Sequence, residues 1–102
     1  MPTQAARLTR ARRMAKKGDA RKMLVALREA CMRDEGAAWL WTLYGARLAQ
    51  HGRFRDAERA FRHALWLRRT SGDAPRARTT QALLDELRGG YVSHFRTGEF
   101  QV

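Results

Sequence analysis

The chain repeats its own pattern of small and large residues at an offset of 34 positions, and this self-similarity constrains the fold more than any other feature. When the sequence is shifted by that interval, glycine meets glycine and most other positions keep their size. The matched pairs are Ala11 with Gly45, Met14 with Leu48, Gly18 with Gly52, Ala20 with Phe54, Leu27 with Phe61, Ala30 with Ala64 and Cys31 with Leu65. A period of this length predicts two copies of one helix–turn–helix unit, because each position keeps its packing role in both copies.

The second copy, residues 38–71, predicts two helices that pack face to face. Residues 38–50 carry one apolar face, made of Leu40, Trp41, Tyr44, Gly45 and Leu48. Residues 54–69 carry another, made of Phe54, Ala57, Ala60, Phe61, Ala64 and Leu65. Both sets follow the spacing of three and four residues that is typical of an amphipathic helix. His51 and Gly52 separate the helices, and glycine suits the left-handed turn after a helix end.

This pattern resembles the tetratricopeptide repeat (TPR) family, whose unit is a pair of antiparallel helices with a 34-residue period. The resemblance depends on Trp41, Tyr44, Gly45, Leu48, Gly52, Phe54, Ala57, Phe61 and Ala64. It covers residues 38–71 most fully and residues 4–37 less fully, because Arg7 and Arg10 stand where large apolar residues are expected. Arg69 stands where the family has a proline near the end of the repeat.

A third copy is not expected, because Thr79 and Glu86 stand where Gly45 and Gly52 would recur. Residues 73–89 instead predict a single capping helix, with Asp73 as the N-cap and Pro75 in the first turn. Its apolar face combines Ala77, Thr80, Leu83, Leu84 and Leu87. Residues 90–102 form a short tail.

The expected fold class is therefore all-α, a single domain of residues 1–102 built as a short TPR-like α-solenoid of about five helices. Repeat 1 spans residues 4–37 with a degenerate first helix, and repeat 2 spans residues 38–71. Tandem arrays of this kind usually need about three repeats for stability. A chain with two repeats is therefore expected to cover its apolar ends with another protein or with a second copy of itself.

The resemblance implies a partner-binding groove lined by the first helix of each repeat. The implied groove positions are Leu8, Arg12, Lys16, Trp39, Thr42, Ala46 and Gln50. A subset of the family uses lysine and asparagine at four such positions to hold a ligand's C-terminal carboxylate. Here these positions hold Leu8, Arg12, Thr42 and Ala46, so a clamp of that kind is not expected.

Two tryptophans lie off the main apolar faces. Trp39 precedes Trp41 by two positions, about 200° around the helix, so both cannot face the same core. Trp39 is either an interface anchor or a contact with the neighbouring repeat. Trp66 raises the same question, with a contact to the capping helix preferred over a partner surface.

Positive charge is concentrated near the N-terminus. The net charge is +11, and residues 1–33 carry ten Lys and Arg against Asp19 and Glu29. Residues 6–17, ARLTRARRMAKK, predict a helix with basic residues on most faces. The basic patch expected around this segment contains Arg7, Arg10, Arg13, Lys17, Arg21 and Lys22. It is a solvated helix face, a docking surface for nucleic acid or another polyanion, or a transit or lipid-surface helix.

Catalytic chemistry finds little support in the sequence. Asp56 and Glu58 sit among arginines and favour local ion pairs. The histidines lack metal-ligand spacing, and no phosphate loop or nucleophile motif occurs. Cys31 falls in an apolar pattern and is expected to be a buried small residue. No metal or other cofactor is expected. No apolar run approaches the ~20 residues of a transmembrane helix.

These features favour a non-enzymatic cytoplasmic adaptor that binds a protein partner, with its basic N-terminal third on an acidic surface. A homo-oligomer is possible on the same grounds, through the apolar ends. The alternative from another class is a factor associated with nucleic acid or a ribonucleoprotein, in which the repeats are a rigid frame for arginine. A small chaperone of a secretion system is a further alternative.

Overall fold

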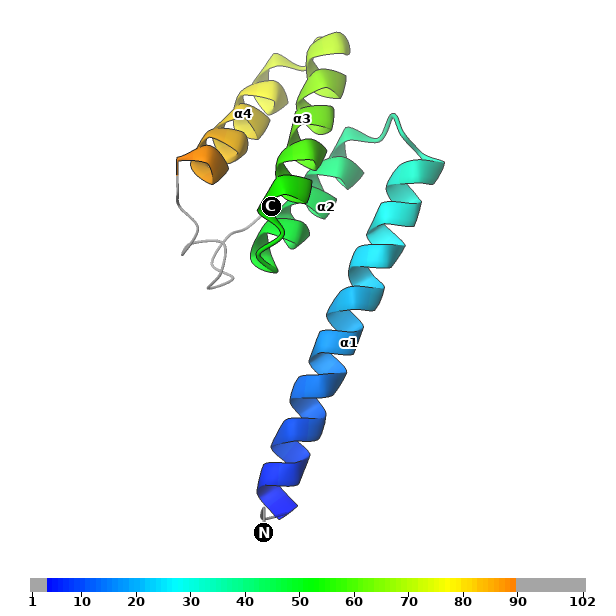
Figure 1. The fold of residues 1–102 in the computed structure, drawn as a ribbon. Helices are drawn as coiled ribbons and strands as arrows, with labels where there is room; N and C mark the ends of the chain where they lie inside the picture. The colour runs from blue at the N-terminus through cyan, green and yellow to red at the C-terminus, as the bar shows by residue number, and fades with distance from the viewer. Residues whose placement is uncertain (1–3, 90–102) are drawn as a thin grey trace.

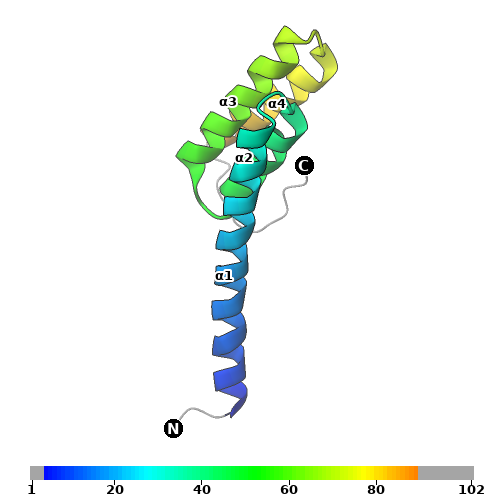
Figure 2. The same ribbon diagram turned by 90° about the vertical axis from the view of Figure 1, so that its right-hand side faces the viewer.

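A computed structural model describes the backbone of residues 4–89 and the side chains of residues 17–89. Within this range the chain is all-helical, with four helices: α1 (Gln4–Arg33), α2 (Ala38–Gln50), α3 (Phe54–Thr70) and α4 (Ala74–Arg88). Helices α2, α3 and α4 pack as a compact group. Helix α1 begins well beyond the other helices, and its second half runs alongside α2 (Figure 1; Figure 2). The predicted tail, residues 90–102, lies outside the described residues.

Helices α2 and α3 lie within residues 38–71, where the sequence predicted two helices that pack against each other. Leu48, Ala57, Phe61 and Ala64 are fully buried. The two helices approach closely at Gly45, where an added Cβ would lie 2.7 Å from two ring atoms of Phe61. Glycine at this position therefore allows the phenylalanine ring to lie directly against the α2 backbone.

The two turns around α3 have the same geometry. Gly52 and Gly72 both have a φ of +76°. In each turn the residue after glycine donates its amide to a carbonyl five positions earlier: Arg53 to Leu48 at 2.9 Å and Asp73 to Arg68 at 2.9 Å. This is the Schellman arrangement that ends a helix on a left-handed glycine.

Helix α4 lies within residues 73–89, where a single helix was expected. The Asp73 carboxylate accepts a hydrogen bond from the backbone amide of Arg76, as an N-cap does. The buried residues of α4 are Ala77, Thr80, Leu84 and Leu87. The same core contains Leu24 of α1 and residues of α2 and α3, so apolar side chains of all four helices share it.

The first copy differs from the expectation. Residues 4–33 form one continuous helix, so residues 4–37 do not fold as a helix pair and the described chain has four helices where about five were expected. Gly18 lies inside α1 and lacks the positive φ of Gly52. Glycine within a helix costs only about 1 kcal/mol. Folding back would also bring Arg7 and Arg10 toward a core that they could not complete.

Candidate functional site

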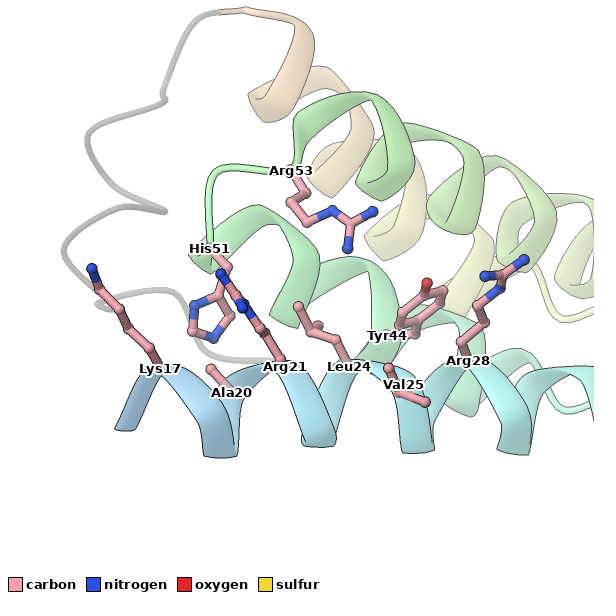
Figure 3. Close-up of a pocket in the computed structure, with 9 residues that line it drawn as sticks. All are labelled: Lys17, Ala20, Arg21, Leu24, Val25, Arg28, Tyr44, His51 and Arg53. Atoms are coloured by element: carbon pink, nitrogen blue, oxygen red, sulfur yellow. The ribbon is translucent and has the colours of Figure 1, made fainter. Parts of the chain in front are cut away.

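A groove lies between α1 and the end of α2, next to the turn into α3. Its cavity has a volume of about 580 Å³. We call it the α1–α2 groove, and Figure 3 shows its walls. It is lined by Lys17, Ala20, Arg21, Leu24, Val25, Arg28, Tyr44, His51 and Arg53.

The α1 wall follows from helical spacing. Lys17, Arg21, Leu24 and Arg28 recur at intervals of three and four residues and so share one side of the helix. They extend along about 16 Å of α1 at 1.5 Å per residue. Figure 3 shows the Lys17, Arg21 and Arg28 side chains on the side of α1 that faces α2 and Arg53. The groove therefore presents an ordered row of cations.

The lining residues make the groove strongly positive. They include Lys17, Arg21, Arg28 and Arg53 and no carboxylate. Arg53 pairs with Asp56 at 2.7 Å. Within the part of the chain that the structure describes, no carboxylate lies within ion-pair distance of Lys17, Arg21 or Arg28. Among the described residues these three side chains have no carboxylate partner, so their charges can take part in binding an anion.

Tyr44 gives the groove a polar group that stays neutral. Burial is the main reason that the pKa of the Tyr44 hydroxyl lies above its ordinary value of 10.0, while Arg28 and Arg53 act in the opposite direction. The phenol therefore keeps its proton at neutral pH and can both donate and accept a hydrogen bond. Its half-buried ring packs against the core together with Trp41.

The groove continues toward the other end of α1. A second cavity of about 310 Å³ shares Arg28, Tyr44 and Arg53 with the first and adds Met32, Arg59 and the carboxylate of Asp56. Val25 is 56% exposed and Met32 is 53% exposed, although both are large apolar residues. Apolar surface and cations therefore alternate along the same side of α1.

The structure places the predicted groove residues differently. Thr42 is only 8% exposed and Ala46 is 0% exposed, so neither can contact a partner. Their prediction as groove residues is wrong, because Ala46 belongs to the core that also holds Leu84 and Leu87 of α4. The Thr42 hydroxyl donates to the Ala38 carbonyl at 2.8 Å, within its own helix. Gln50 is half-buried.

The structure describes the side chains of only some residues of the predicted basic patch. Lys17, Arg21 and Lys22 are exposed, and the first two line the α1–α2 groove. The side chains of the other predicted residues on the first half of α1 lie outside the described residues. They are Arg7, Arg10 and Arg13 of the basic patch and Leu8, Arg12 and Lys16 of the predicted groove.

Sequence reasoning missed Arg28, Tyr44, His51 and Arg53 as lining residues. A signal for Arg28 was present, since it lies seven positions after Arg21 on the same helix side. His51 and Arg53 flank Gly52, and only the angle between α1 and α2 brings them opposite α1.

The exposed tryptophans lie outside the groove. Trp39 is 62% exposed, which fits the interface alternative and excludes a core role. Trp66 is 60% exposed and so does not pack fully under α4. Trp41 is structural: its Nε1 donates to the Glu35 carbonyl at 3.0 Å and holds the connection between α1 and α2.

Other site chemistry is limited in the described chain. Among residues 17–89 no three His, Cys, Asp or Glu side chains are grouped as a metal site. Cys31 is buried, and this burial raises the pKa of its thiol, so the thiol stays protonated at neutral pH. None of the described helices has the length and hydropathy needed to cross a bilayer.

Comparison with known proteins adds no relative. No protein-family model, curated protein or solved structure matches the chain.

Proposed function

We propose that the protein is a non-enzymatic adaptor that binds an acidic segment of a partner protein in the α1–α2 groove. The observation that supports this most is the row of uncompensated cations in a cavity of about 580 Å³. In this proposal α2 and α3 form one TPR-like repeat. The second half of α1 packs on it as the preceding repeat's second helix would, and α4 caps the other side.

A protein segment suits the groove better than a nucleic acid does. Leu24 and Val25 lie between the cations, and Met32 continues the apolar strip. Leucine-like side chains of a partner would fill these sites, and neighbouring glutamates would reach Arg21 and Arg28. The cations steer the encounter and set orientation, while apolar burial supplies affinity at about 25 cal/mol per Å² before ordering costs.

A second copy of this chain is a poor occupant. With a net charge of +11, two copies repel each other, and an opposing groove would bring like charges together. The homo-oligomer expected as a possibility is therefore not proposed through this surface.

Binding of an acidic amphipathic peptide tests the proposal. The probe is a fluorescein-labelled peptide in which leucine and glutamate repeat at helical spacing, and the readout is fluorescence anisotropy. The double variant Arg21→Glu/Arg28→Glu is expected to weaken binding by roughly tenfold or more, because like charges across an interface cost over 1.4 kcal/mol.

The matched control is Arg78→Glu on α4, which makes the same kind of change at an exposed residue away from the groove. It is expected to leave binding within about twofold, since a distant exposed charge is screened at physiological salt. Equal losses in both variants, or a peptide that does not bind, would contradict the proposal.

One observation favours a nucleic-acid role as the second candidate. The first half of α1 projects beyond the other helices (Figure 1), and residues 4–22 carry eight Lys and Arg against Asp19. A long basic helix of this kind suits a phosphate backbone. Binding of generic duplex DNA that falls steeply between low and physiological salt supports this candidate, and salt-insensitive or absent binding argues against it.

A further inference from the structure

The outer face of α3 carries a straight row of arginines interrupted by one tryptophan. The row comprises Arg55, Arg59, Arg62, Trp66 and Arg69, all of them exposed. Successive members are four, three, four and three residues apart, so they share one side of the helix along about 21 Å. The opposite side of α3 is buried. We call this row the α3 ridge. None of its residues lines the first cavity of the α1–α2 groove, and only Arg59 also lines the second cavity that continues the groove.

The charges of the α3 ridge are largely uncompensated. Within the described chain, no carboxylate lies within ion-pair distance of Arg55 or Arg62. The two carboxylates of α3 are committed elsewhere: Glu58 pairs with Arg88 of α4 at 2.9 Å, and Asp56 pairs with Arg53 at 2.7 Å. Asp56 reaches the ridge only through a long 3.9 Å contact with Arg59.

Trp66 presents its ring on this row. Its residue surface is 60% exposed, whereas the neighbouring Leu65 and Leu84 are buried. Trp66 lines a cavity of about 270 Å³ together with Arg62, Leu65, Arg69, Gln81, Leu84 and Arg88. Arg69 donates to the Gln81 side chain at 3.1 Å, a neutral acceptor that positions the guanidinium without cancelling its charge. The ring centroids of His63 and Trp66 are 6.0 Å apart.

We propose that the α3 ridge binds single-stranded nucleic acid, with a base stacked on Trp66 and phosphates held by Arg59, Arg62 and Arg69. Arginine forks match phosphate oxygens, and an exposed indole gives a stacking surface for any base. A duplex keeps its bases stacked on each other, so it would use the arginines alone. An acidic polypeptide would likewise leave the indole without a stacking partner.

Stacking on Trp66 is tested with a labelled single-stranded oligouridine of about twelve nucleotides. Trp66→Ala is expected to weaken binding by at least about fivefold, which is the lower end for loss of one base–aromatic stack. Trp66→Phe should retain most of the affinity. Trp39→Ala is the matched control, because Trp39 is equally exposed but stands on α2 outside the ridge. Circular dichroism melts verify that each variant is folded.

Phosphate contacts are tested by salt dependence. Each contact with a single strand contributes about −0.7 to the slope of log affinity against log salt. Arg62→Ala should make this slope less steep by about 0.7, while Arg78→Ala on α4 should not change it.

The outcomes separate this inference from the proposed function. The inference is wrong if Trp66→Ala binds oligouridine with the affinity of the unaltered protein. It is also wrong if Trp39→Ala lowers that affinity as much as Trp66→Ala does. It is also overturned if polyglutamate of equal charge displaces the oligouridine and binds as tightly, because the ridge would then be a face for acidic protein. Binding of the leucine–glutamate peptide in the α1–α2 groove should be unchanged by Trp66→Ala in every case.

Discussion

At the residue scale, the Asp73 carboxylate caps α4, and the stability that it contributes depends on pH. Its carboxylate accepts from the Arg76 amide at 3.3 Å and from the Arg76 guanidinium at 3.0 Å. The hydrogen bond from the Arg76 side chain is the main reason that the pKa of Asp73 is below its ordinary value of 3.8. A carboxyl group with a lowered pKa in the folded state stabilises the fold above its unfolded pKa, and this contribution is lost as pH falls through the folded value.

Asp73→Ala should therefore lower the Tm at pH 7 by a few degrees, and the difference from the unaltered protein should shrink as pH falls below about 3.8. Thermal melts followed by circular dichroism at several pH values measure this. Asp34→Ala serves as the control, because that exposed carboxylate caps no helix N-terminus. A difference that stays constant down to pH 2 would show that Asp73 acts without its charge.

At the element scale, the aligned glycines Gly18 and Gly52 have opposite roles. Gly18 lies inside α1, where a Cβ added to it would meet nothing within 4 Å, whereas Gly52 forms a turn with a φ of +76°. Gly18→Ala should stabilise the protein by up to about 1 kcal/mol and increase its helicity. Gly52→Ala should destabilise it by about 1 kcal/mol or more. Urea unfolding measures both, and destabilisation by Gly18→Ala would indicate a turn within residues 4–33.

The same pair shows what sequence could predict. The turn at Gly52, the contact of Phe61 with Gly45 and the cap at Asp73 were all predictable, because each depends on local spacing and residue size. The continuous α1 was not, since a glycine is compatible with both a turn and a helix interior. Whether Gly18 forms a turn or stays within a helix depends on how much apolar area the residues before it could bury. The sequence also could not predict that Arg28, Tyr44 and Arg53 line one groove, because this depends on the angle between helices.

At the scale of the whole molecule, the straight α1 makes the chain elongated. Its principal extents are 60 × 31 × 19 Å and its radius of gyration is 16.2 Å. A compact chain of this length has a radius of gyration of about 13 Å. Small-angle X-ray scattering in dilute solution should therefore give a value near 16 Å. A value near 13 Å would mean that α1 folds back as a hairpin, and the open groove beside α2 would then be closed.

The claim that an acidic segment binds between α1 and α2 is tested most directly by nuclear magnetic resonance. Isotope-labelled protein is titrated with the leucine–glutamate peptide at physiological salt, and backbone amide shifts are followed. The largest changes should occur at Arg21, Leu24 and Arg28 of α1 and at Tyr44 and Arg53 opposite them. Changes that are confined to the outer face of α3 or to α4, or that are spread evenly over the chain, would contradict the claim.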